Sequence, residues 1–428
     1  MTTRRGEGVL GPVRMPVLPA LITLGVFGWA AFAFLAAASY ANDPPSAAFD
    51  LELLLDAGRL VAGGRSPYDP ALVAGRSVEI QSLFYSYPPL VAQATSLVAA
   101  VPSALVFATW IVASIVLLAP VARIIRDQFA PAVPWVLPVV ASVALAPLWF
   151  PFTVGALFGN LDVFFPALYG LVLVAAAPGH GAVGSPRRLA IAGGVALAVA
   201  SITKLHPALL ALWFALRGVR VLRARPAAVA STRHEATDRT GSPLPWVVLG
   251  AATLTGLVVL AVSLVAGGLQ PWLDYVAVLR AGTNVDLLDH RNLGPAVQLV
   301  MVLGLGPAAV APIHALVLAL AIAITAWAAL RVDDPLESFA WASFASFVPM
   351  PVTWFHHFGA LLPIGLAAAL RSMSAGLRAQ RLTVASIAAA FLIGIVGLGM
   401  PVAWLVLPLT IAAVRASRPP GRRENGGS

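Results

Sequence analysis

Carboxylates cluster in a chain in which charge is otherwise scarce. Asp, Glu, Lys and Arg make up only 11% of the 428 residues, yet one short segment holds Asp50, Glu52, Asp56 and Asp69. Arg65 and Tyr68 lie in the same segment. A positioned carboxylate can take a proton from a nucleophile as a general base. We therefore interpret this segment as part of a catalytic pocket in which Asp50, Arg65 and Tyr68 are candidate site residues.

Asp50 also has a simpler interpretation. Leu51, Leu54 and Leu55 recur with helical spacing and predict an amphipathic helix that Gly63 and Gly64 end. Asp50 stands where the N-cap of this helix is expected, and an Asp is a good N-cap residue.

Polar residues at expected helix breaks give further candidates. Lys204 and His206 stand between two short apolar segments, where cations and free backbone N–H groups favour phosphate; a snorkelling lysine is the alternative. Tyr87 precedes Pro88 and Pro89, which also suit a rigid entry turn before a helix.

The last candidates are His356, His357 and Arg291. Adjacent residues on a helix point about 100° apart, so one metal ion shared by both histidines is awkward. The chain has no cysteine, which excludes cysteine metal sites and disulfides. We expect no metal and no cofactor.

Composition predicts the fold class. The apolar content of 59% and mean hydropathy of +0.88 are typical of an all-α polytopic membrane protein. A β-barrel would show short alternating segments instead. The net charge of +9 resides in loops between apolar segments, which favours membrane topology over nucleic-acid binding. We place twelve spans near residues 16–40, 88–122, 132–152, 161–177, 189–203, 205–216, 244–268, 308–330, 337–350, 352–370, 383–399 and 401–416.

The basic residues orient these spans. Of the 27 Lys and Arg residues, 21 fall on one side, and the other side has Arg59, Arg65, Arg76, Lys204, Arg280 and Arg291. By the positive-inside rule both termini are cytoplasmic. Residues 1–416 form one transmembrane domain, with outer loops 41–87 and 269–307, a flexible cytoplasmic loop 224–243 and a disordered tail 417–428.

Two functional classes fit this topology. No ionisable residue falls near the middle of an expected span, whereas ion-coupled transporters usually place one there. Polar chemistry at the outer boundary suits an enzyme whose substrate is carried by a membrane lipid. The alternative is a transporter or flippase for a lipid-linked saccharide, and a structural membrane subunit is a third possibility.

Several motifs resemble glycosyltransferase family 87, over about residues 16–370. The family pattern of Asp, an apolar stretch, Gly and Ser/Asp-Pro-Tyr is matched in register by Asp50, Ala57, Gly64, Ser66, Pro67 and Tyr68. Tyr87-Pro88-Pro89 resembles the next motif. Lys204 and Pro207 match Lys-x-x-Pro, and Trp354 with His356 and His357 matches a Trp-x-His-His region with displaced spacing.

Two segments depart from the family pattern. Gly159-Asn160-Leu161-Asp162 stands where Gly-Gln-x-Asn is expected. His290-Arg291-Asn292-Leu293-Gly294 stands where an Asn-Gln-Ser type segment is expected. Either departure alters which acceptor the resemblance implies.

The resemblance implies a GT-C fold and transfer of mannose from polyprenyl-phosphate-mannose, with inversion, to a glycolipid or lipoglycan acceptor. Phosphatidylinositol mannosides and lipomannan are the acceptors that the family suggests. The resemblance also implies that Asp50 is the base, on the outer face of the plasma membrane. A phosphate leaving group needs neutralising cations, for which Lys204, His356, His357 and Arg291 are candidates. No Asp-x-Asp pair is available outside for a metal and a nucleotide sugar, so a lipid donor is preferred.

Overall fold

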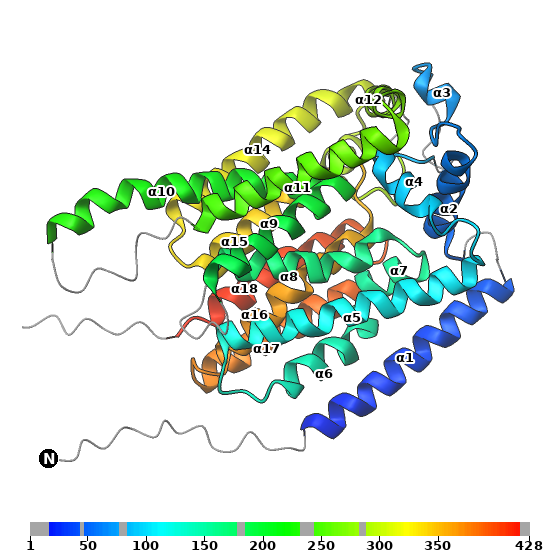
Figure 1. The fold of residues 1–428 in the computed structure, drawn as a ribbon. Coiled ribbons are helices and arrows are strands. Elements are labelled where there is room, and N and C mark those ends of the chain that lie inside the picture. Colours follow the sequence, from blue (N-terminus) through cyan, green and yellow to red (C-terminus); the bar gives the residue numbers. More distant parts are fainter. Residues whose placement is uncertain are drawn as a thin grey trace, which may run out of the picture.

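The protein is an all-α molecule, seen here in a computed structural model (Figure 1). The structure describes residues 17–42, 47–76, 84–177, 185–231, 244–281 and 288–419, without the side chains of 224–231. Within these residues there are helices and no strands. The α-helices are α1 (Val17–Asn42), α2 (Phe49–Ala62), α3 (Pro70–Val73), α4 (Pro89–Ser96), α5 (Ser103–Phe129), α6 (Val136–Leu145), α7 (Phe150–Leu157), α8 (Phe165–Ala176), α9 (Pro186–Thr203), α10 (Leu209–Ser231), α11 (Leu244–Gly267), α12 (Gln270–Ala281), α13 (Pro295–Val302), α14 (Val310–Arg331), α15 (Pro335–Phe347), α16 (Leu362–Ser372), α17 (Leu377–Val396) and α18 (Val406–Ala416).

Short 3-10 turns lead into many of these helices. They are η2 (Ala146–Leu148), η3 (Leu161–Phe164), η4 (His206–Ala208), η6 (Pro307–Ala309), η7 (Phe355–Leu361) and η8 (Pro401–Leu405). A proline stands in the first two positions of η2, η4, η6 and η8, where its missing N–H leaves no helical bond unmade.

Fewer helices are long enough to cross a membrane than the hydropathy pattern predicts. Five qualify in the described chain, namely α1, α5, α11, η6 with α14, and α17. A sixth arises if the pair formed by α6–η2 and α7, bent by 67°, is one broken span. Most of the other expected spans are helices too short for the roughly 20 residues of a straight crossing. The expected membrane class is confirmed, and the count of twelve is not.

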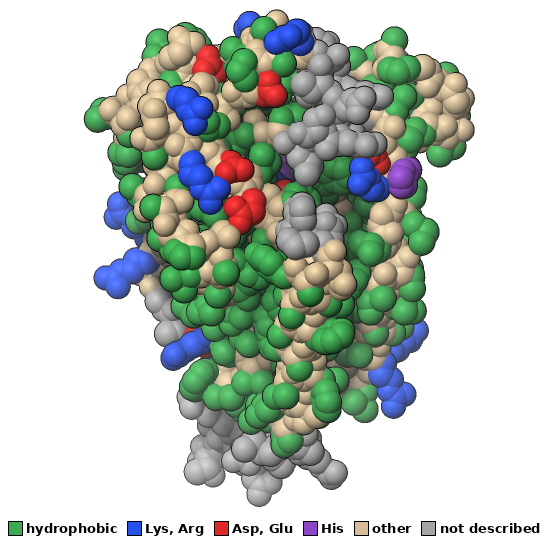
Figure 2. Space-filling view, turned by 90° about the vertical axis from the view of Figure 1, so that its right-hand side faces the viewer, with side chains coloured by type: hydrophobic (Ala, Val, Ile, Leu, Met, Phe, Trp, Pro, Cys, Tyr) green, Lys and Arg blue, Asp and Glu red, His purple; other side chains and the backbone are tan. Residues whose placement is uncertain are grey.

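One end of the bundle differs from the rest. The helices α2, α3, α4 and α12 gather there, opposite the first turns of α1 and the last turns of α18 (Figure 1). Figure 2 faces this end, where acidic and basic side chains gather in the upper half above a mainly hydrophobic surface. The two segments expected to be outer loops, 41–87 and 269–307, meet through Ser66, whose hydroxyl donates to Asp274 over 2.7 Å.

The helix α2 is docked by its first turn. The N–H groups of Ala48 and Asp50 donate to the carbonyls of Leu157 (3.1 Å) and Phe158 (3.0 Å) at the end of α7. Leu51 is fully buried, as the amphipathic pattern predicts. The cap interpretation of Asp50 is wrong, because the N-cap is Ala48 and Asp50 lies in the first helical turn.

An ionic cluster ties the chain together at the other end. Glu337, only 3% exposed, accepts from Arg415 (2.8 Å) and Arg418. Asp334 caps α15 and pairs with Arg371 over 2.7 Å. The first residues of the expected tail 417–428 therefore take part in the fold, whereas residues 420–428 lie outside the described residues. Of the expected loop 224–243, residues 224–231 continue α10 and the rest lies outside the described residues.

Gly159 makes the close approach of α2 and α7 feasible, and its replacement tests this docking. Its φ is +67°, and a Cβ there would lie 2.6 Å from the Cβ of Leu51. Gly159→Ala should lower the unfolding midpoint in detergent, because it adds about 1–3 kcal/mol of steric cost to a left-handed penalty of about 1–2 kcal/mol. Gly64→Ala is the control, since Gly64 has a φ of +71° with no atom within 4 Å of the added Cβ. Equal losses in the two variants would contradict the docking role.

Candidate active site

The site begins with a hydrogen bond between two segments far apart in the sequence. The side-chain amide of Asn160 donates to Asp50 Oδ2 over 2.7 Å. The Asn160 Oδ1 atom accepts the backbone N–H of Asp162 (3.0 Å), which fixes the orientation of the amide. Asp50 is partly buried, and burial raises its pKa to about 6. The Asn160 bond and the charge of Lys204 lower this pKa, while Asp162 raises it.

Asp162 is the buried centre of the site. Its side chain is 3% exposed and lies on η3, directly after the Asn160 turn. Lys204, at the C-terminal end of α9, reaches it with Nζ 2.9 Å from Oδ1 and 3.0 Å from Oδ2. A charge at this depth is stable only when paired, and Lys204 supplies that partner.

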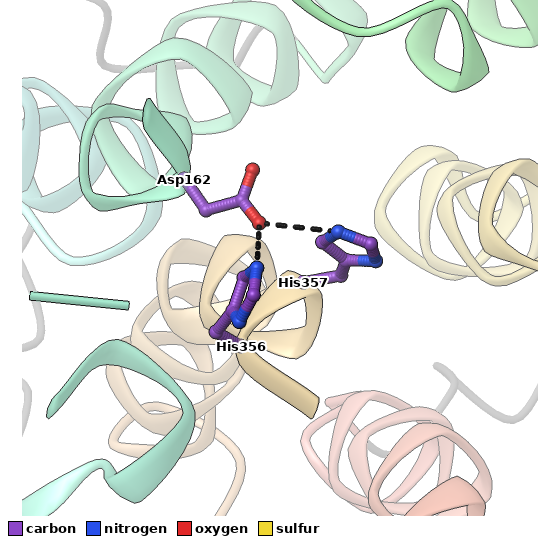
Figure 3. A group of neighbouring side chains, drawn as sticks. All are labelled: Asp162, His356 and His357. Carbon is purple, nitrogen blue, oxygen red and sulfur yellow. Dashed lines mark ion pairs between the residues drawn. The ribbon is translucent and has the colours of Figure 1, made fainter. Parts of the chain in front are cut away.

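Two histidines complete the cluster around Asp162 (Figure 3). His356 and His357 both lie on η7 and turn their rings toward one oxygen of Asp162. Their Nε2 atoms lie 3.3 Å and 3.5 Å from Asp162 Oδ2. His356 Nε2 makes no hydrogen bond to a described residue, although it is buried. It is therefore available to a ligand.

The second histidine is held neutral by the donors around it. The backbone N–H of Trp354 donates to His357 Nδ1 over 3.1 Å. His357 Nε2 lies 2.9 Å from Lys204 Nζ, and an ammonium can only donate. Because both ring nitrogens face N–H donors, His357 is neutral.

The same geometry argues against a metal ion. The ligand atoms of Asp162, His356 and His357 lie within 4.8 Å of one another, as in a metal site. A metal bound to Asp162 and His357 Nε2 would have to displace Lys204, whose Nζ lies 2.9 Å from Asp162 Oδ1 and 2.9 Å from His357 Nε2. The residues present therefore fit a lysine ammonium better than a divalent cation.

The segment around Asn292 holds the histidine loop, residues 351–357, in place. The fully buried Asn292 accepts the N–H of Thr353 (3.0 Å) and donates to the Pro351 carbonyl (3.1 Å). The carbonyl of Thr353 accepts the N–H of Leu293 over 2.7 Å. These bonds fix the residues that lead into η7.

Comparison with known protein families finds one match. A model of glycosyltransferase family 87 matches residues 85–355, more than half of the chain. The chain belongs to glycosyltransferase family 87. No curated protein and no solved structure matches it. The matched range includes Asn160, Asp162 and Lys204, and it is narrower than the range over which the motifs resemble the family.

Of the other predicted site residues of this glycosyltransferase, Tyr87 and His206 lie beside the cluster. Tyr87 interacts with the Asn160 side chain, and burial together with Asp50 and Asp162 holds its pKa well above the ordinary range. The His206 ring lies 6.2 Å from that of His357, with Nδ1 3.4 Å from the Tyr169 hydroxyl.

Three predicted site residues have other surroundings. Tyr68 is buried, and its hydroxyl donates to the Tyr87 carbonyl over 2.9 Å, so it holds the Tyr87 backbone in position. Arg65 is exposed beyond the end of α2. The charge of Arg291 is paired with Asp289 over 2.6 Å, and Arg291 holds the Asp289 pKa below its ordinary value. The structure does not bring these three into the Asp162 cluster.

Asn160 and Asp162 did not appear among the predicted site residues. The signal was present, because both lie in the segment that departs from the family pattern. An Asn and an Asp beside a Gly are also typical of an ordinary turn. The sequence alone therefore did not identify these two residues as part of a site.

The raised pKa of Asp50 predicts an effect on stability. An unfolded Asp has a pKa of about 3.9, below the value of about 6 in the folded chain. The folded state therefore binds more protons between these values, and the stability that Asp50 contributes falls as pH rises through them. Relative to wild type, Asp50→Asn should unfold at a higher temperature at about pH 7.5, and the difference should shrink at about pH 4.5. Asp56→Asn, on the solvated face of the same helix, is the control; a pH-independent difference for Asp50→Asn would contradict the shift.

Proposed function

We propose that this family 87 glycosyltransferase moves mannose from polyprenyl-phosphate-mannose to a glycolipid or lipoglycan acceptor, with inversion. The observation that carries the proposal is the Asp50 carboxylate, oriented by Asn160 beside a buried lysine. The reaction needs a base for the acceptor hydroxyl and a cation for the departing phosphate. Both groups converge on this cluster.

Asp50 is the proposed base. Its carboxylate takes the proton of the acceptor hydroxyl while the hydroxyl oxygen forms a bond to C1 of the mannose. The bond between C1 and the phosphate oxygen breaks, and its electron pair leaves with the polyprenyl phosphate. A pKa of about 6 suits this role, because the group is ionised near neutrality yet holds a proton well.

Lys204 is the proposed partner of the phosphate. Its side chain is 12% exposed, so the ammonium acts in a poorly hydrated site where its charge is effective. His356 presents an unbonded Nε2 beside it. A positioned cation and hydrogen-bond donors stabilise the charge that develops on the leaving phosphate.

An apolar groove supports a lipid donor. A cavity of about 350 Å³ is lined by Leu117, Pro120, Val121, Ile124, Leu161, Phe164, Phe165, Ala167, Leu168, Leu171, Val199 and Thr203. Of these residues, Leu161 adjoins Asp162 in the chain, and Thr203 adjoins Lys204. A prenyl chain bound in this groove would therefore have its phosphate near Lys204. The apolar lining suits such a chain better than it suits a free nucleotide sugar.

The proposed location is the plasma membrane, with the site on the outer face and both termini in the cytoplasm. The excess of Arg residues on the opposite side supports this orientation. The first turns of α1 and the last turns of α18 lie at the end of the bundle away from α2 (Figure 1), which agrees with termini on one side.

The central test is transfer of labelled mannose from polyprenyl-phosphate-mannose to endogenous lipids in membranes. Asp50→Asn should lower the rate at least about 100-fold, since general-base catalysis contributes about 10²–10⁴-fold. Asp56→Asn at matched abundance is the control, because Asp56 lies on the same helix, is 66% exposed and pairs with Arg59. Full activity of Asp50→Asn would refute its role. Failure of the wild type to transfer would refute the donor and favour a transporter of lipid-linked saccharides.

The pH dependence gives a second test. The rate at low donor concentration should fall below about pH 6, where Asp50 becomes protonated. Asn160→Ala should move this midpoint to higher pH, because the Asn160 hydrogen bond lowers the Asp50 pKa. Initial rates at a series of pH values measure both midpoints. A midpoint that moves to lower pH in Asn160→Ala would contradict this assignment.

A further inference from the structure

The basic residue at the centre of the cluster is exceptional in this chain. Lys204 is the only lysine among the 27 Lys and Arg residues. An ammonium is a compact charge with rotatable donors, whereas a guanidinium holds a carboxylate in a rigid two-point contact. A lysine is therefore suited to exchange one anion for another.

The cation of the cluster is already occupied in this structure. Lys204 Nζ lies within 3.0 Å of both Asp162 oxygens. His357 adds no charge, because its Nδ1 accepts the Trp354 N–H. The Asp162 carboxylate thus occupies the position beside Lys204 that a phosphate would need. If both stayed, two anions would share one buried cation.

One unbonded atom marks where a ligand would enter. His356 Nε2 is buried and makes no hydrogen bond to a described residue, although buried polar atoms normally have such a partner. It lies 3.3 Å from Asp162 Oδ2, and the other oxygen, Oδ1, lies 2.9 Å from Lys204 Nζ. An anion that replaced the carboxylate would therefore contact the lysine and the imidazole.

We propose that Asp162 is a built-in counter-ion that yields Lys204 to the phosphate of the lipid donor. This inference rests on the proposed function. Asp162 is then a positioning residue. It holds Lys204 in place before the donor binds. Because it competes for Lys204, it also lowers the affinity of the site for phosphate, so that the lipid product can leave.

The displaced carboxylate should take up a proton. At 3% exposure it has little water to replace the lysine, and a buried carboxylate without a cation is neutralised. The charged and titratable groups around it are Lys204, His356 and His357, then Asp50 and Tyr87 beyond Asn160, and His206 beyond His357.

The first test is binding of farnesyl methyl phosphate, a diester with one charge, to the full chain in detergent. Asp162→Asn should bind it about tenfold more tightly than wild type, which corresponds to about 1.4 kcal/mol. Asp274→Asn is the matched control, because Asp274 is also buried but accepts hydrogen bonds from Ser66 and Gln270. The affinity for uncharged farnesol should be the same in all three proteins.

Kinetics separate this role from a structural one. In Asp162→Asn the KM for the donor and kcat should both fall, because substrate and product are held more tightly. A residue that only supported Lys204 would raise KM when removed. In a Lys204→Ala background, Asp162→Asn should bring no gain in phosphate binding. Weaker or equal diester binding by Asp162→Asn would overturn the inference and leave the proposed function standing.

A last measurement needs no change at Asp162. Calorimetry in buffers of different ionisation enthalpy should show proton uptake when the diester binds to Asp50→Asn, in which the other carboxylate is absent. The diester does not titrate near neutrality, so the proton must enter the protein. Binding without proton uptake would overturn the inference. Proton uptake that persists in the double variant Asp50→Asn with Asp162→Asn would also overturn it. No binding of the diester to the wild type would refute the proposed donor itself.

Discussion

A buried ion pair constrains the whole site. Asp162 and Lys204 have side chains exposed by 3% and 12%, and burial of either charge alone would cost several kcal/mol. The pair forms only if the turn after α7 and the end of α9 meet. The histidine loop must meet them too, because His356 and His357 close the remaining side. The positions at which these helices end are therefore dictated by the charges as much as by local propensity.

This constraint explains why so many helices are short. Side chains that must converge lie at helix ends or on 3-10 turns: Asp162 on η3, Lys204 after α9, and both histidines on η7. Helix ends also leave backbone groups unpaired, and the site uses them: the Phe158 carbonyl accepts N–H groups from the first turn of α2, and the Trp354 N–H donates to His357 Nδ1. Continuous spans of 20 residues would bring none of these groups together, so the polar end of the bundle is built from broken helices.

Hydropathy predicts the apolar segments well, because burial of apolar residues is a local property of sequence. The bounds of α2 and α11 agree closely with the pattern. Spacing does not predict which loops meet: Asn160 bonds to Asp50 across 110 positions, and Lys204 contacts His357 across 153. Arg291 illustrates the same limit. Its charge looked available for phosphate, but Asp289, two residues earlier, pairs with it. The motifs thus located most of the cluster, and the partner of each charge required the fold.

The two carboxylates on either side of Asn160 have different surroundings. Asp162 has an ammonium 2.9 Å away, whereas Asp50 makes no ion pair with any residue that the structure describes and has only the neutral amide of Asn160 as its hydrogen-bonded side-chain partner there. A cation favours the charged form of a carboxylate beside it, whereas desolvation favours the protonated form. Asn160 contacts the two residues differently: its amide donates to the Asp50 carboxylate, and its Oδ1 accepts the backbone N–H of Asp162. In the proposed reaction, Asp50 can therefore take the acceptor proton while Lys204 faces the leaving phosphate.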